Sequence, residues 1–191
     1  MLNQTRIPGQ RVAITEDDFR TPSREWFRFF EYIYKASVAG DRGAFYDTTS
    51  TAWTANTPSQ VPIGSTSLFD GVTVAASKIA FSTAGVYVIT ASFQLSNDNA
   101  SNDDDMTIWL RVNGADVAYS SSRMTVPKRH AGIAGSALMT VNFLYEFAVG
   151  DYFELYGLSK LGYVQIVTYA ASSSPAYPAA PGTILTVAQI L

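Results

Sequence analysis

From about residue 43 onward, apolar and polar residues alternate in short segments that are separated by Gly, Ser, Thr, Asn and Pro. Alternation with a period of two is the pattern of a β-strand that buries one face. In the clearest segment, residues 86–96, one face carries Tyr87, Ile89, Ala91, Phe93 and Leu95. The recurrence of such segments predicts an all-β fold, an antiparallel sandwich or barrel.

Two tight turns are predicted in this region. Residues 106–112 alternate, with Met106, Ile108, Leu110 and Val112 inward, and Asn113-Gly114 is a pair typical of a hairpin turn. The strand at 116–120 should return beside them. Gly150-Asp151 similarly predicts a hairpin over residues 138–158, in which Tyr145 faces Tyr156.

The second hairpin would be apolar on both faces. One face would carry Met139, Val141, Phe143, Tyr145, Phe147, Tyr152 and Tyr156, and the other Leu138, Leu144, Phe153 and Leu155. The last strand, residues 183–191, is two-faced as well. Since an antiparallel sandwich strand normally exposes one face to water, these patterns predict that a neighbouring subunit covers the second face.

Before this β region, residues 22–34 contain six aromatic rings and predict a short helix. Thr21 can cap it, Pro22 suits its first position and Gly40 can end it. Helical spacing places Trp26, Phe29, Phe30 and Ile33 on one side, with Phe27 and Tyr34 along one flank. Such a helix either packs on its own domain or docks on another protein.

Composition excludes several classes of function. The net charge of −3 gives no electrostatic footprint for nucleic acid, and the absence of Cys excludes disulfides and thiolate chemistry. A single His leaves little room for histidine chemistry, so we do not expect an enzyme. The start of the chain lacks the apolar run of a signal peptide, and no segment is apolar enough to span a membrane. We therefore expect a protein that is made in a cytosol and either stays there or leaves by lysis.

Two polar loops are candidates for ligand contacts. Residues 97–105 hold Asp98, Asp103, Asp104 and Asp105, oxygen ligands that suit Ca²⁺, although their spacing is not that of an EF-hand and a solvated acidic loop is the alternative. Residues 120–130 hold Arg123, Lys128, Arg129 and His130, which could contact an anionic glycan or a capsid protein. The alternative there is an exposed loop that balances the acidic one.

The run Lys78-Ile-Ala-Phe-Ser-Thr-Ala-Gly-Val-Tyr-Val-Ile-Thr-Ala-Ser-Phe resembles the signature region of the C1q and tumour-necrosis-factor-like jelly rolls. Trp109-Leu-Arg-Val-Asn-Gly-Ala-Asp, Ala148-Val-Gly-Asp-Tyr-Phe-Glu-Leu and the closing strand from Thr183 extend the likeness, with Gly43-Ala-Phe-Tyr as the opening strand. The resemblance covers residues 43–191 and implies a ten-stranded jelly roll in a tight homotrimer with an apolar axis. The expected trimer interface and core residues are Phe81, Tyr87, Phe93, Phe143, Tyr145, Phe147, Tyr152 and Tyr156.

A second resemblance concerns the arm, residues 1–42. Pro22-Ser-Arg-Glu-Trp-Phe-Arg-Phe-Phe resembles a short motif near the N-terminus of bacteriophage tail-fibre, spike and head-fibre proteins. It implies an arm that anchors the protein to capsid, neck or tail proteins of the virion. The expected anchor residues are Pro22, Arg24, Trp26, Phe27, Phe29, Phe30 and Tyr34.

Together these features predict a structural virion surface protein, a homotrimeric head fibre or capsid decoration protein without a cofactor. The alternative is a tail-associated or free trimer that binds a host receptor or glycan during host attachment. A depolymerase is a third reading, but its two carboxyl candidates, Glu146 and Glu154, fall on opposite faces of the predicted hairpin.

Overall fold

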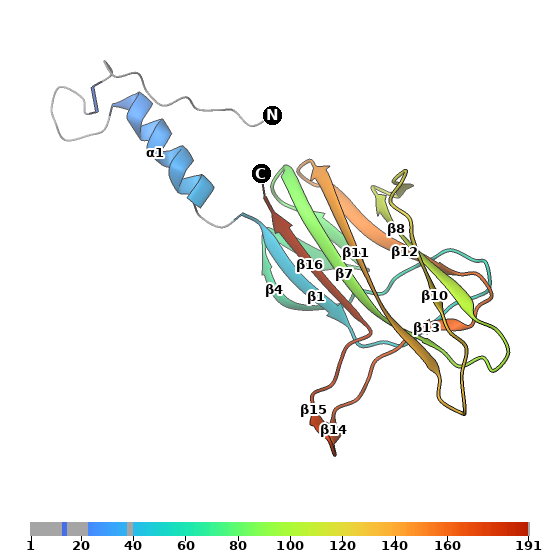
Figure 1. Ribbon diagram of the computed structural model, residues 1–191. Helices are drawn as coiled ribbons and strands as arrows, with labels where there is room; N and C mark the ends of the chain where they lie inside the picture. The colour runs from blue at the N-terminus through green and yellow to red at the C-terminus, as the bar shows by residue number, and fades with distance from the viewer. Residues whose placement is uncertain (1–12, 15–22, 38–39, 191) are drawn as a thin grey trace. The chain divides into compact units, whose positions relative to one another are not determined.

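The computed structural model describes residues 13–14, 23–37 and 40–190, with the backbone alone for residues 32–37. The chain divides into two compact units, residues 1–40 with residue 191, and residues 41–190. The second unit is a sandwich of two antiparallel β-sheets (Figure 1). This confirms the predicted all-β sandwich with one short helix.

The first sheet, here called sheet I, has β1 (Arg42–Asp47), β16 (Thr183–Gln189) and β7 (Gly85–Asn97) at its centre. Its edges are β4 (Ser65–Asp70), which pairs with β1, and β11 (Gly135–Phe147), which pairs with β7. Two short strands continue it, β13 (Val164–Ile166) beside β7 and β2 (Thr51–Ala52) beside β13. Figure 1 shows β1, β16, β7 and β11 running side by side in this layer.

The second sheet, sheet II, runs in the order β10 (Ser122–Val126), β8 (Asp104–Val112), β12 (Tyr152–Ser159), β6 (Lys78–Phe81) and β5 (Val72–Ala75). The short β3 (Ser59–Gln60) and β9 (Ala115–Asp116) pair with β12 and β8. A separate hairpin, β14 (Ser172–Ser173) and β15 (Ala176–Tyr177), pairs with neither sheet. The chain passes repeatedly between the sheets and places β16 between β1 and β7, which is the connectivity of a jelly roll.

The inward faces follow the predicted alternation. Tyr87, Ile89, Ala91, Phe93 and Leu95 of β7 and Met106, Ile108 and Leu110 of β8 are all buried. An aromatic group fills one end of the core, where the Phe81 ring stacks on that of Phe147 at 4.1 Å and lies 4.4 Å from that of Tyr87. Such packing between two inner faces is the main source of a sandwich's stability.

The predicted hairpin over residues 138–158 is wrong. β11 pairs with β7 in sheet I, whereas β12 pairs with β8, β6 and β3 in sheet II. The turn at Gly150 therefore joins strands of different sheets, so the inward residues of β11 face Phe153 and Leu155 of β12 across the core. The inward residues of β11 are Met139, Val141, Phe143, Tyr145 and Phe147.

The turn at Asn113-Gly114 is present, with φ angles of 50° and 80°. Only Ala115–Asp116 then pairs with β8, rather than the predicted residues 116–120. The chain leaves the ladder at Val117 and rejoins it in β10, where Ser122 lies opposite Ile108.

The predicted helix is α1 (Arg24–Ser37). It starts later than expected, directly after the buried Ser23, and Thr21 and Pro22 lie outside the described residues. The Ser23 carbonyl accepts a hydrogen bond from the Phe27 N–H at 2.8 Å, and its hydroxyl donates to the Ala13 carbonyl at 2.6 Å. Ser23 thus precedes the first turn of the helix and connects it to Ala13.

Candidate functional site

The aromatic side chains of Trp26, Phe29 and Phe30 form a cluster on α1. The Trp26 ring lies 5.5 Å from that of Phe29 and 5.6 Å from that of Phe30. Phe27 and Phe30 are nevertheless 56% and 47% exposed, and Arg24 is exposed as well. Of the other expected anchor residues, Pro22 and the side chain of Tyr34 lie outside the described part of the chain.

The predicted aromatic face that joins β11 and β12 is also wrong, because these strands belong to different sheets. Phe81, Tyr87, Phe93 and Phe147 are buried, and Phe143 and Tyr145 pack against the same core. Tyr152 and Tyr156 instead lie on the outer side of sheet II, where Lys78 Nζ and the Arg111 guanidinium sit over their rings at 4.5 and 4.2 Å. Six of these eight residues thus belong to the core of the sandwich or pack against it, and Tyr152 and Tyr156 lie outside it.

A different surface, composed of apolar and mostly uncharged polar side chains, lies on the outer side of sheet I. Three rows of residues cross β1, β16, β7 and β11 there. We call the surface that these three rows form the sheet I face. The rows are Tyr46, Ile184, Ser92 and Thr140, then Ala44, Thr186, Thr90 and Asn142, then Arg42, Ala188, Val88 and Leu144. Leu144 is 64% exposed and Ile184 44% exposed.

Four polar side chains in the middle of the sheet I face are paired with one another. Thr90 Oγ1 donates to Asn142 Oδ1 at 2.7 Å, and the hydroxyls of Ser92 and Thr140 are 3.0 Å apart. Of the residues in the three rows, Arg42 alone carries a charge, and it lies at one end beside Asp70. Because these groups already have partners, covering the face would leave few unsatisfied polar atoms.

The predicted acidic and basic segments lie side by side and form two ion pairs. Arg129 Nη1 lies 3.3 Å from Asp98 Oδ1, and Arg123 Nη1 lies 3.9 Å from Asp105 Oδ2. The backbone N–H of Lys128 donates to Asp103 Oδ1 at 2.8 Å. The backbone of His130, the fourth predicted basic residue, forms a two-way bridge with Ile133.

Asp104 differs from the other carboxylates of this loop because it is buried. Its oxygens accept hydrogen bonds from the Ser159 hydroxyl at 2.6 Å and from the N–H groups of Leu161, Tyr163 and Val164 at 2.9, 2.9 and 3.3 Å. Burial opposes ionisation, but these donors outweigh it and lower the pKa of Asp104. Asp104 therefore holds the loop after β12 in place.

The four predicted calcium ligands consequently face four separate sets of partners. Within the described residues, no three His, Cys, Asp or Glu side chains gather in a group that could hold a metal ion. The two carboxyls weighed for glycoside hydrolysis also lie apart, since Glu146 is on β11 in sheet I and Glu154 is on β12 in sheet II.

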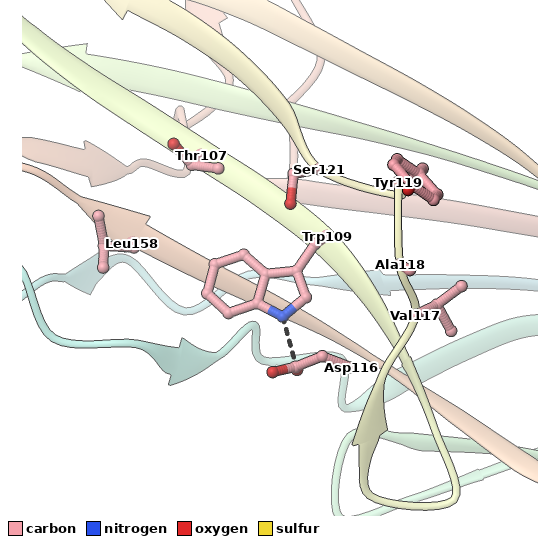
Figure 2. A pocket seen from close by; sticks show the side chains of 8 residues that line it. All are labelled: Thr107, Trp109, Asp116, Val117, Ala118, Tyr119, Ser121 and Leu158. Atoms are coloured by element: carbon pink, nitrogen blue, oxygen red, sulfur yellow. Dashed lines mark hydrogen bonds between the residues drawn. The ribbon is translucent and has the colours of Figure 1, made fainter.

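A hollow of about 320 Å³ lies on the outer side of sheet II, around the outward-facing ring of Trp109. We call it the Trp109 hollow, and Figure 2 shows its lining. It is lined by Thr107, Trp109, Asp116, Val117, Ala118, Tyr119, Ser121 and Leu158. Its volume falls at the lower end of the range for small-molecule sites, roughly 300–1,000 Å³.

The indole of Trp109 is held in one orientation. Its Nε1–H donates to Asp116 Oδ1 at 2.8 Å, as the dashed line in Figure 2 marks. Arg111 Nε lies 3.0 Å from the same oxygen, an ion pair whose N–H is not aligned for a hydrogen bond. The Arg111 guanidinium in turn stacks on Tyr156, the residue opposite Trp109 on β12.

Tyr119 stands on the rim of the hollow in a strained conformation. Its φ is +63°, and its side chain is 107% exposed. The buried Ser120 imposes this turn, because its hydroxyl accepts the Leu110 N–H at 3.1 Å and donates to the Val117 carbonyl at 2.8 Å. A bulky residue in the left-handed region costs energy, and such strain often occurs at functional sites.

Sequence reasoning missed the Trp109 hollow. A Trp at an outward position of residues 106–112 was a detectable signal, since a large ring on a solvent-facing strand side needs a partner. The contributions of Tyr119 and Leu158 were not detectable, because they depend on the turn after β9 and on the pairing of β12 with β8.

Comparison of the chain with known protein families finds no matching family, and comparison with characterised proteins finds no similar protein. Within the described residues, no helix is both long enough and apolar enough to cross a membrane.

Proposed function

We propose that this protein is a structural surface protein of a bacteriophage virion, a head fibre or capsid decoration protein. Its jelly-roll unit assembles as a homotrimer through the sheet I face, and its N-terminal arm attaches it to the particle through α1. The observation that carries the proposal is the largely uncharged sheet I face, which holds exposed Leu144 and Ile184 around paired polar side chains.

The chemistry of the sheet I face favours another copy of the same chain as its occupant. Its centre has no charge, so three copies of the face can meet around one threefold axis without like-charge repulsion. Apolar side chains continue beyond the three rows, with Leu138 next to Gln94 on β7 and Leu68 opposite Ala44. Exposed apolar side chains on a largely uncharged face are typical of a subunit interface.

The number of copies and the place of action follow from the two resemblances in the sequence. Kinship with the C1q and tumour-necrosis-factor-like proteins is supported by the jelly-roll connectivity and implies three copies. The phage motif overlaps the start of α1, whose rings Phe27 and Phe30 are exposed. Since exposed aromatic rings are strong anchors in protein interfaces, α1 suits attachment to another virion protein.

The assembly is tested by measuring the mass of the full-length chain in solution by light scattering. Wild type should be trimeric, and the double variant Leu144→Glu/Ile184→Glu should dissociate, because burying six carboxylates in the trimer would be costly. The matched control is Ile133→Glu, an exposed loop position that should stay trimeric. A monomeric wild type, or a double variant that remains trimeric, would contradict the proposed interface.

The attachment is tested by replacing Trp26, Phe27 and Phe30 with Ala and measuring how much of the protein copurifies with virions. The triple variant should remain trimeric but be lost from particles. Normal loading of this variant would refute the anchor. A wild type that is absent from particles but binds host cells would favour the alternative, a free trimer that binds a receptor or glycan.

A further inference from the structure

The Trp109 hollow has the composition of a carbohydrate site. One indole ring, fixed by its hydrogen bond to Asp116, offers a flat apolar surface on the outer side of sheet II. Leu158 and Thr107 lie on one side of that ring and the turn that carries Val117, Ala118 and Tyr119 on the other (Figure 2). A ligand that rests on the ring would therefore meet side chains from two strands and a turn.

Hydrogen-bonding groups surround this apolar surface. The hydroxyls of Thr107, Tyr119 and Ser121 can each donate and accept, and a carboxylate can only accept. Asp116 uses Oδ1 for Trp109 and Arg111, while its Oδ2 accepts no hydrogen bond within the described part of the chain. The lining thus combines one aromatic platform with acceptors and mixed donors at its edge.

We propose that the Trp109 hollow binds a neutral saccharide. One face of a pyranose ring presents C–H groups that can stack on the Trp109 indole, while its hydroxyls point sideways toward Asp116, Thr107 and Ser121. The lining contains no cationic side chain that would favour an anionic sugar, and the Asp116 carboxylate, which is paired with Arg111, can accept hydrogen bonds from sugar hydroxyls through Oδ2. The predicted basic residues Arg123, Lys128, Arg129 and His130 are not part of the lining.

Tyr119 supplies the second stacking surface. Its ring gains no packing energy from the protein, and its backbone is held at an unfavourable φ by the buried Ser120. Displaying a large aromatic ring in this way costs stability and brings no benefit to the fold, which points to a role in ligand contact. A sugar seated on Trp109 would be within reach of this ring at the rim.

The saccharide site does not depend on the proposed virion function. The Trp109 hollow is on the outer side of sheet II, whereas the sheet I face is on the outer side of the other sheet. The two layers of the sandwich separate the surfaces, so assembly through sheet I would leave the hollow open. The site would give a surface protein a means of holding host or environmental glycans.

The proposal is tested by NMR on full-length, uniformly ¹⁵N-labelled protein. The chain has three Trp residues and so three indole N–H signals, and the signal of Trp109 is assigned by its loss in Trp109→Phe. The probes are the neutral disaccharides lactose, cellobiose, maltose, chitobiose and mannobiose. The anionic comparison ligand is 3′-sialyllactose. At least one neutral disaccharide should shift the Trp109 signal at millimolar concentration and leave that of the buried Trp53 unchanged.

Three variants separate binding at this hollow from binding elsewhere. Tyr119→Ala and Asp116→Asn should each weaken the affinity for that disaccharide by about tenfold, the effect of losing one good contact. Tyr177→Ala removes an exposed ring on β15, outside the hollow, and should leave the affinity unchanged. Both affected variants should keep the wild-type spectrum elsewhere, which excludes unfolding as the cause.

Three results would overturn the proposal. The first is that no neutral disaccharide shifts the Trp109 signal. The second is that sialyllactose binds more tightly than lactose, which would indicate an anion site. The third is that Tyr119→Ala and Asp116→Asn bind as well as wild type.

Discussion

The Ser159 hydroxyl donates a 2.6 Å hydrogen bond to Asp104 Oδ2 in the interior of the sandwich. The contact joins the start of β8 to the end of β12, and the same carboxylate accepts three backbone N–H groups of the following loop. An acidic residue in a loop that resembled a calcium ligand set is thus a structural anchor. Its role could not be recognised from the run of Asp residues alone.

Replacing Asp104 with Asn should destabilise the protein strongly. The substitution removes one acceptor oxygen and the charge that strengthens the remaining hydrogen bonds, so the free energy of unfolding should fall by about 3 kcal/mol. Asp103→Asn is the matched control, because Asp103 is exposed and accepts from a single N–H. Urea denaturation at neutral pH measures both, and equal effects of the two variants would contradict the anchoring role.

The stability contributed by Asp104 should disappear in acid. Its pKa is lower in the folded state than its ordinary value of 3.8, so the unfolded chain takes up the proton first as the pH falls. The stability that Asp104 contributes is therefore complete when the pH is above the pKa of Asp104 in the unfolded chain. It is lost as the pH falls through the pKa of Asp104 in the folded protein. The difference in stability between wild type and Asp104→Asn, measured by urea denaturation from pH 7 to pH 2, should shrink below about pH 4. A difference that stays constant to pH 2 would show that the ionised form is not the stabilising one.

Tyr119→Gly should stabilise the protein while weakening saccharide binding. Glycine adopts a φ of +63° without the steric cost that Tyr119 bears, and the lost ring makes no compensating contact because it is fully exposed. The free energy of unfolding should rise by about 1 kcal/mol. The control Tyr177→Gly, at an exposed position without a positive φ, should lower it. A loss of stability in Tyr119→Gly would mean that the turn is not strained.

Gly157→Ala should destabilise the core by about 1–3 kcal/mol through overpacking. A Cβ at Gly157 would lie 2.7 Å from both Met106 Cε and Trp53 Cη2, distances that require these side chains to move. Met106→Ala opens space at this point, so the double variant should be more stable than the sum of the two single effects predicts. Thermal denaturation of wild type, the two single variants and the double variant measures the coupling energy between positions 106 and 157. Strict additivity of the two single effects would exclude a clash with Met106.

The sequence alone determined the local structure of most strands. Side chains alternate across a strand whatever it pairs with, so Tyr87, Phe93 and Met106 could be placed in the core from the pattern of residues 86–96 and 106–112. The Asn113-Gly114 turn and the existence of a helix after residue 22 were determined in the same way, by local backbone preferences.

The tertiary structure alone decided which strands are neighbours. A Gly-Asp turn can join two strands of one sheet or lead from one sheet to the other, and the choice depends on long-range packing that no local pattern encodes. That choice placed Leu144 on the sheet I face, and Tyr156 opposite Trp109 on sheet II. The Trp109 hollow exists for the same reason, because it brings Thr107, Tyr119 and Leu158 together from segments that meet only when the sandwich has formed.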